Sequence, residues 1–75
     1  MPRLKLTFRE LIEILLSHGF ELERQKGSHR QYRRRLGDEV WLVTVANHND
    51  GDIIKPGTLA SMIRQSGLPK ADFKK

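Results

Sequence analysis

The sequence has no cysteine, few aromatic residues and no long apolar run. Without cysteine the chain forms neither disulfides nor thiolate–metal bonds, and a cysteine nucleophile is excluded. No apolar stretch reaches the roughly 18 residues of a membrane-spanning helix, so we expect no contact with a membrane. The first residues also lack the apolar core of a secretory signal. These absences predict a soluble, cytoplasmic protein.

Motifs that bind metals or nucleotides are missing as well. No two histidines have the spacing of a zinc site. The acidic pairs Asp38/Glu39 and Asp50/Asp52 are typical of turns rather than of metal sites. No glycine-rich phosphate loop of the Walker or Rossmann type is present. We therefore expect no metal and no cofactor.

Positive charge is what the chain has in excess. Its 75 residues include 14 Lys or Arg against 9 Asp or Glu, which gives a formal net charge of +5. This length predicts a single domain that spans residues 1–75. A small basic domain favours a nucleic acid or an acidic protein as its partner.

The spacing of apolar residues predicts a first helix over residues 8–18. Thr7 and Glu10 match a capping box, in which the hydroxyl and the carboxylate each accept a backbone amide of the first turn. Apolar residues then recur at helical spacing on one face. Gly19 suits the position after the helix, where a left-handed conformation is common.

A second helix is predicted over about residues 57–66. Pro56 suits its first turn, Gly67 suits the position after its end, and apolar residues recur between them. The tail that follows is short. We expect Phe73 to fold back onto the helices.

Three segments between the helices read as strands, at residues 20–25, 29–35 and 40–45. Turn residues separate them, and Tyr32 is the expected core anchor of the middle strand. The third strand is almost continuously apolar, which predicts that it is well covered. The fold class is therefore α+β, with the order helix, three antiparallel strands, helix. Two helices on one face of the sheet would leave the other face open.

The tripeptide Gly27-Ser28-His29 begins the most basic segment of the chain. Lys26 precedes it, and four arginines follow it within six residues, at Arg30, Arg33, Arg34 and Arg35. An imidazole among cations suits chemistry on a polyanion, with Lys26, Arg30 and Arg33 as phosphate ligands. The alternative is a solvated edge strand, whose charges prevent aggregation.

Two other histidines compete with His29 for a functional role. His18 lies in the last turn of the first helix, where a cation interacts favourably with the helix dipole, so a structural role is expected. His48 lies in a polar loop. His29 and His48 would suit RNA cleavage if they lay close together, because one group must take the ribose 2′-OH proton and another must protonate the leaving 5′-oxygen.

Three short motifs, in this order and at this spacing, resemble the HicA toxin family of mRNA interferases. The first is His18-Gly-Phe20 followed by Arg24-Gln-Lys-Gly-Ser-His29. The second is Val43-Thr-Val45 followed by His48. The third is Lys55-Pro-Gly-Thr-Leu59 with Ile63-Arg-Gln65 and Gly67-Leu68. The resemblance covers nearly the whole chain.

This resemblance implies a fold similar to the double-stranded RNA-binding domain, in the order α-β-β-β-α. It implies a ribonuclease toxin that cleaves mRNA and so inhibits translation, with His29 as the catalytic residue, a general acid or base. The neighbours of His29 are the RNA contacts that we expect: Lys26, Gly27, Ser28, Arg30 and Arg33. A HicB-like antitoxin would be the protein partner and would cover the site. Ala46-Asn47 stands where the family often has proline, so the role of His48 stays open.

Two other functions fit the same residues. One is a non-catalytic RNA-binding module that uses the same basic surface. The other is a protein-binding subunit whose basic face docks an acidic partner.

Overall fold

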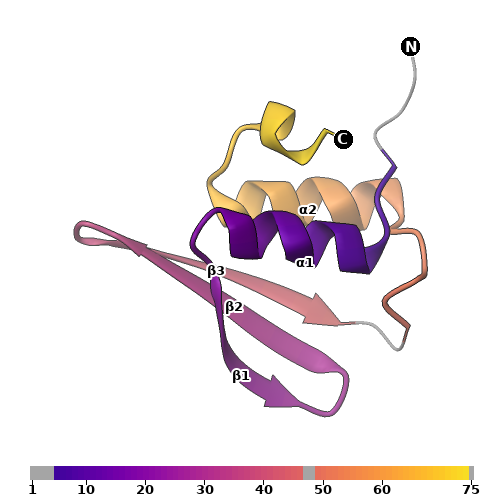
Figure 1. The fold of residues 1–75 in the computed structure, drawn as a ribbon, viewed down its shortest axis with the longest axis horizontal. Helices are drawn as coiled ribbons and strands as arrows, with labels where there is room; N and C mark the ends of the chain where they lie inside the picture. Colours follow the sequence, from indigo (N-terminus) through magenta and orange to yellow (C-terminus); the bar gives the residue numbers. More distant parts are fainter. Residues whose placement is uncertain (1–4, 47–48, 75) are drawn as a thin grey trace.

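The structure is a computed structural model that describes residues 5–46 and 49–74. The elements in chain order are α1 (Phe8–Ser17), β1 (Glu21–Lys26), β2 (His29–Leu36), β3 (Glu39–Ala46), α2 (Pro56–Ser66) and the short 3₁₀ helix η1 (Lys70–Phe73). The strands form one antiparallel sheet in the order β1-β2-β3. Figure 1 shows α1 and α2 on the same side of this sheet. The predicted α+β fold is confirmed, with element ends that differ by no more than one residue.

The first helix starts and ends where its sequence signals place it. The Thr7 hydroxyl accepts the Glu10 amide at 3.1 Å, and the Glu10 carboxylate accepts the Thr7 amide at 3.0 Å, so the predicted capping box is formed. The helix ends at Ser17, one residue before the predicted end, because His18 is already its C-cap. Its buried residues, Leu11, Ile12, Ile14 and Leu15, belong to the hydrophobic core.

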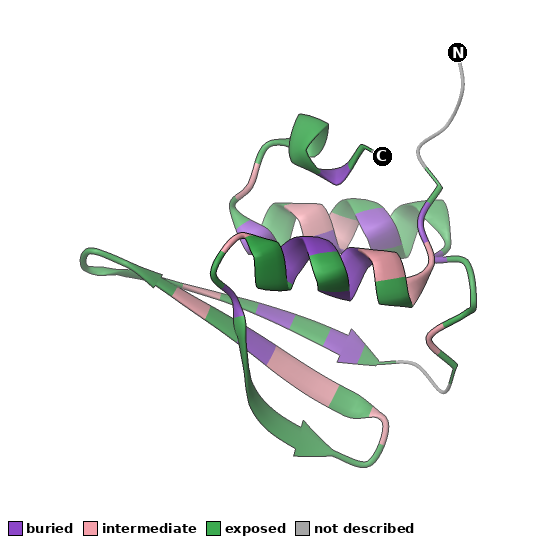
Figure 2. Ribbon diagram, viewed as in Figure 1, coloured by how far each residue is buried: buried purple, intermediate pink, exposed green. Residues whose placement is uncertain are grey.

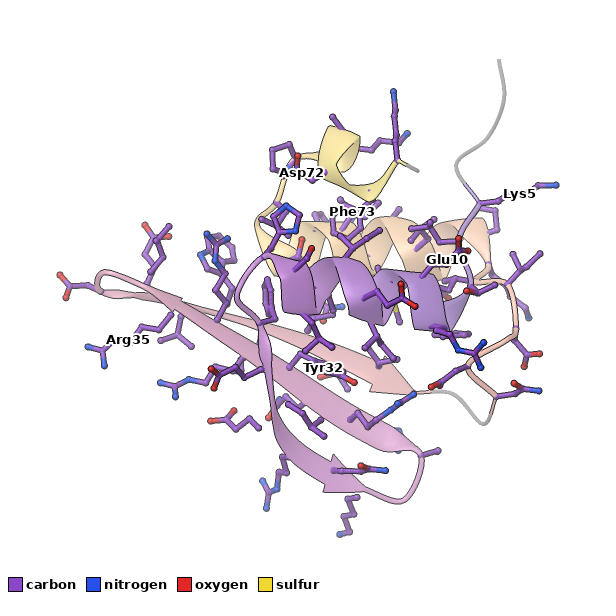
Figure 3. The ribbon with its side chains drawn as sticks, viewed as in Figure 1. Lys5, Glu10, Tyr32, Arg35, Asp72 and Phe73 are labelled. Carbon is purple, nitrogen blue, oxygen red and sulfur yellow. The ribbon has the colours of Figure 1, made fainter. Side chains whose placement is uncertain are left out.

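The core lies between the two helices and one face of the sheet. Its fully enclosed apolar members come from α1, β3 and η1 and from the segments before α1 and before β1: Leu6, Leu11, Leu15, Phe20, Val43, Val45 and Phe73. Tyr32 is the buried residue of β2, as predicted, and lies between the sheet and α1 (Figure 3). Figure 2 shows that burial follows this helix-facing side of the sheet, while β1 is exposed along its whole length.

The third strand is not covered on both sides, which corrects the expectation drawn from its apolar run. Val43 and Val45 are fully buried, whereas Val40 and Leu42 remain 46% and 41% exposed. Side chains alternate between the two faces of a strand, and the helices cover only one of them. We call the uncovered side of the sheet the open face.

The arginine-rich segment forms the middle of the sheet. β2 pairs with β1 on one side and with β3 on the other, so the edge-strand interpretation of its charges is wrong. Its arginines therefore divide between the two faces. Arg33 and Arg35 share the open face with His29, whereas Arg30 and Arg34 share the covered side with Tyr32.

The segment after β3 is attached to the beginning of α1. The first amides of the helix, which lack partners within it, donate to carbonyl oxygens of this segment: Phe8 to Asp52 at 3.1 Å and Arg9 to Asp50 at 2.9 Å. The amide of Ile54 donates to the Leu6 carbonyl at 2.9 Å, which extends the attachment. The segment is thereby fixed near the end of the sheet where His29 pairs with Ala46, next to the turn between β1 and β2.

The carboxyl-terminal tail folds back onto the helices. Phe73 is fully buried and points from η1 towards them (Figure 3), so the predicted return of the tail is confirmed. Asp72 lies 3.4 Å from His18 Nε2, which ties η1 to the end of α1. The residue after α2, Gly67, has φ +70, and a Cβ atom there would lie 2.8 Å from the Trp41 ring. Only glycine allows the helix to end so close to β3.

Candidate functional site

His29 is the first residue of β2, and a two-residue turn places it directly opposite Lys26. Gly27 has φ +58 and Ser28 has no positive φ, which is the pattern of a type II′ hairpin turn. The turn matches the right-handed twist of the flanking strands. His29 and Lys26 are both exposed, and as paired residues they share the open face.

A β-bulge decides which residues of β1 accompany His29. The register shifts between Leu22 and Arg24, so that Glu23 has no partner of its own in β2. Arg24 therefore pairs with Gln31, and its side chain lies on the open face. In an unbroken ladder Arg24 would share a face with Leu22, on the covered side. The bulge thus moves two cations, Arg24 and Lys26, to the face of His29.

These residues surround a shallow hollow of about 310 Å³ on the open face. We call it the His29 hollow; its lining residues are Arg24, Lys26, His29, Arg30, Gln31 and Thr44. Across the described residues, no carboxylate forms an ion pair with Arg24 or Lys26. The hollow therefore combines an accessible imidazole with two cations, Arg24 and Lys26, whose charge no acidic side chain of the described residues offsets.

Arg30 differs from the other lining residues of the hollow, because the alternation along β2 places its side chain on the covered side of the sheet. Its Nη2 lies 2.5 Å from Asp50 Oδ1, and its Nη1 lies 3.4 Å from Oδ2, which is a two-pronged ion pair. The hydrogen bond to Asp50 raises the pKa of Arg30, and burial opposes that rise. Burial raises the pKa of Tyr32, against the effect of the Arg30 charge. Arg30 is thus held among residues of the covered side.

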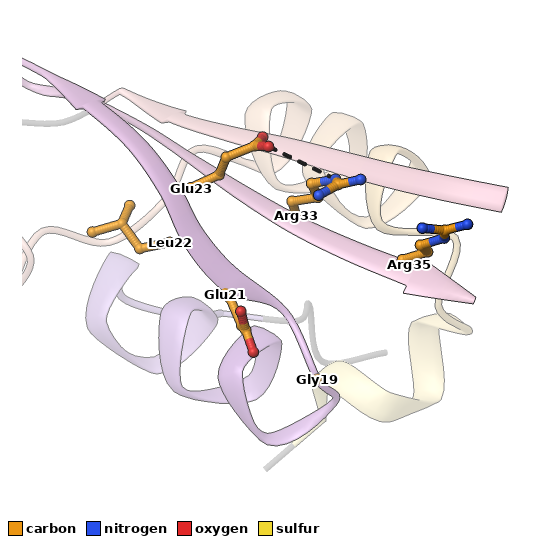
Figure 4. A pocket seen from close by; sticks show the side chains of 6 residues that line it. All are labelled: Gly19, Glu21, Leu22, Glu23, Arg33 and Arg35. Carbon is orange, nitrogen blue, oxygen red and sulfur yellow. Dashed lines mark ion pairs between the residues drawn. The ribbon is translucent and has the colours of Figure 1, made fainter. Parts of the chain in front are cut away.

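A second hollow, of about 320 Å³, lies at the other end of the sheet. Figure 4 shows its lining residues, which are Gly19, Glu21, Leu22, Glu23, Arg33 and Arg35. Arg33 Nε lies 3.7 Å from a carboxylate oxygen of Glu23. We call this the Arg35 hollow. Because it holds two carboxylates beside its two guanidinium groups, its charge is balanced.

His18 lines neither of these two hollows. His18 Nδ1 is 2.8 Å from the Ile14 carbonyl oxygen, and Nε2 faces Asp72, so this histidine joins α1 to η1 as a structural residue. His48 lies outside the described residues, and so does its pairing with His29.

Among residues 5–46 and 49–74, no three His, Asp or Glu side chains gather as metal ligands would. No helix in the same residues is long and apolar enough to cross a membrane.

Sequence reasoning identified His29, Lys26 and the Gly27-Ser28 turn, and it missed the partners that other strands supply. Gln31 follows from the alternation along β2, since it lies two residues after His29. Arg24 and Thr44 depend on the bulge and on the register between β2 and β3, which no local pattern reveals. Asp50 was expected only as a turn residue, and its ion pair with Arg30 was not foreseen.

The hollow has the parts that phosphodiester chemistry needs, namely a group that exchanges a proton and cations for the phosphate oxygens. Fold and site define a small basic α+β domain with an exposed histidine on the open face of its sheet. Comparison with protein families matches residues 8–68 to the model described as "HicA toxin of bacterial toxin-antitoxin". The chain belongs to the HicA toxin family, and its function is that of a toxin of a toxin–antitoxin module. No curated protein matches the chain.

Proposed function

We propose that this protein is a ribonuclease toxin that cleaves mRNA and thereby inhibits translation. The observation that carries the proposal is the exposed imidazole of His29 beside Arg24 and Lys26, two cations without a carboxylate partner in the described residues. RNA is a polyanion, and it carries its own nucleophile in the ribose 2′-OH. Such a site needs only proton transfer and charge stabilisation from the protein.

The reaction begins with attack of the ribose 2′-oxygen on the adjacent phosphorus. The 2′-OH loses its proton, the bond from phosphorus to the 5′-oxygen breaks, and that oxygen takes up a proton as it leaves. His29 serves as the general base or the general acid of this exchange. The products are a 2′,3′-cyclic phosphate and a free 5′-hydroxyl.

Binding of the phosphates falls to the cations of the open face. Lys26 and Arg24 stabilise the negative charge that grows on the phosphate during the attack. The Gly27-Ser28 turn has no bulky side chain, so an RNA strand can approach the backbone beside His29 closely. Arg33 lies farther along the same face, where its bond to Glu23 limits it to an accessory contact.

The partner of such a toxin is a HicB-like antitoxin, which follows from membership of a toxin–antitoxin family. An antitoxin that covers the His29 hollow would exclude RNA from it. Carboxylates on the antitoxin would suit the cations of the hollow. A toxin that acts on mRNA works in the cytoplasm.

Cleavage of a defined RNA by the purified chain tests this function. We expect a 2′,3′-cyclic phosphate at the cut and no cut where the ribose 5′ to the bond is replaced by deoxyribose, because the nucleophile is then absent. Uncut RNA that is bound with strong salt dependence would replace the ribonuclease with a non-catalytic RNA-binding module. RNA that is neither bound nor cut would favour a protein-binding subunit.

A further inference from the structure

Asp50 is fixed to two elements at once. Its backbone carbonyl accepts the amide of Arg9 in the first turn of α1 at 2.9 Å. Its carboxylate accepts both terminal nitrogens of Arg30, at 2.5 and 3.4 Å. Asp50 thus connects the beginning of α1 to the second residue of β2.

The Arg30 side chain is enclosed where it meets Asp50. Its neighbours across the sheet are Gln25 and the fully buried Val45, and only 18% of its side chain is exposed. Hydrogen bonding to Asp50 and the charge of Asp50 both raise the pKa of Arg30, and Tyr32 adds to this rise. Arg30, Asp50 and Tyr32 therefore form one polar group under the sheet. A guanidinium held there is turned away from the RNA that would lie on the open face.

His29 and Arg30 share one peptide bond and point to opposite faces of β2. When Asp50 holds the Arg30 side chain below the sheet, it also limits rotation of the backbone that carries the His29 side chain above it. The Gly27-Ser28 turn limits the same residue from the other side. Proton transfer requires such control, because a catalytic group displaced by about 1 Å loses roughly 100-fold in rate.

We propose that Asp50 is a positioning residue, which acts through Arg30 to hold His29 in the orientation that cleavage requires. The kinetic part of this inference depends on the proposed ribonuclease function. The structural part, which concerns the orientation of His29, does not. Arg30 contributes to the reaction from beneath the sheet rather than as a ligand of phosphate.

The test is Asp50→Asn, with Asp52→Asn as its matched control. Asp52 is an exposed carboxylate of the same segment, and within the described residues only its backbone forms hydrogen bonds. Single-turnover cleavage of a short RNA should fall about 10- to 100-fold in Asp50→Asn at saturating enzyme, because the support of a catalytic group is lost. The RNA dissociation constant should stay close to that of the unaltered protein. Asp52→Asn should change neither quantity.

A second measurement uses no RNA. The measurement is NMR spectroscopy of the RNA-free protein. The imidazole and amide resonances of His29 should shift or broaden in Asp50→Asn and should be unchanged in Asp52→Asn. This result separates the two proposals, since a protein that cleaves no RNA still reports the orientation of His29. If Asp50→Asn does not fold, Arg30→Lys serves in its place, because lysine keeps the charge but cannot form the two-pronged bond.

Three results would overturn the inference. One is normal cleavage by the Asp50→Asn protein. Another is His29 resonances that are unchanged in the folded variant. The third is tighter RNA binding with cleavage retained, which would show that Asp50 withholds Arg30 from phosphate instead of supporting His29.

Discussion

The two ends of the open face are made from the same three strands, yet they differ in charge. The turn end, which carries the Gly27-Ser28 turn between β1 and β2, holds the His29 hollow. There Arg24 and Lys26 have no carboxylate partner among the described residues. The opposite end, where a hairpin joins β2 to β3, is the hairpin end. It holds the Arg35 hollow, where Glu21 and Glu23 balance the charge of Arg33 and Arg35. Most of the arginine run lies towards the hairpin end, but the available positive charge lies at the turn end. A run of cations therefore predicts a binding surface only when the neighbouring strand is known.

The bulge at Glu23 marks the boundary between these two ends. Before it, Glu21 pairs with Arg33, and a carboxylate lies on the open face. After it, Arg24 and Lys26 lie on that face. One additional residue in β1 thus exchanges acidic side chains for basic ones at the place where His29 begins β2.

The strongest test of this difference is His29→Ala. We expect cleavage of RNA to fall about 10²- to 10⁴-fold, because a general acid or base is lost. Arg35→Gln, at the opposite end of the same face, should cleave close to the wild-type rate. The melting temperatures of both variants should resemble that of the unaltered protein, since both side chains are exposed. Equal cleavage by His29→Ala and the wild type would remove His29 from the reaction.

The next test compares the covered side of the molecule with the open face. Leu15 is fully buried, so Leu15→Ala should lower the free energy of unfolding by about 2–5 kcal/mol through lost burial and the cavity left behind. Leu42→Ala, on the open face, should cost clearly less. Urea denaturation measures both. A cost for Leu42 that matches the cost for Leu15 would mean that this side of the sheet is covered in solution.

Salt dependence of RNA binding separates the two ends by charge. Lys26→Gln should weaken binding and reduce the slope of log K against log salt by about 0.7, the value for one phosphate contact on a single strand. Arg33→Gln should change the slope less, because Arg33 already pairs with Glu23. Titrations at several salt concentrations give the slopes. Equal changes of slope in the two variants would show that RNA contacts both ends of the open face.

The smallest effect is expected at the hairpin end. Val40→Thr keeps a β-branched side chain on a half-exposed position, so the free energy of unfolding should change by no more than about 0.5 kcal/mol. RNA affinity should be unchanged. A larger loss of stability that depends on protein concentration would indicate that copies of the chain associate through this end.

Much of the fold was predictable because its signals are local. The capping box of Thr7 and Glu10 placed the start of α1, and Gly67 placed the end of α2. The apolar run of β3 gave the wrong prediction that this strand is well covered, because composition does not tell whether both faces of a strand are covered. The edge-strand interpretation of the arginines failed for a related reason. Strand order depends on contacts between distant segments.

Local sequence signals are enough to specify the helices and strands, the Gly27-Ser28 turn and His29 as the principal catalytic candidate. These follow from backbone preferences and side-chain chemistry that act over a few residues. Tertiary structure alone decided which cations join His29 and which are held elsewhere. The bulge brought Arg24 to the open face, and Asp50, twenty residues along the chain from Arg30, bound that arginine beneath the sheet. Both depend on register and on contacts between distant segments, which no short motif specifies.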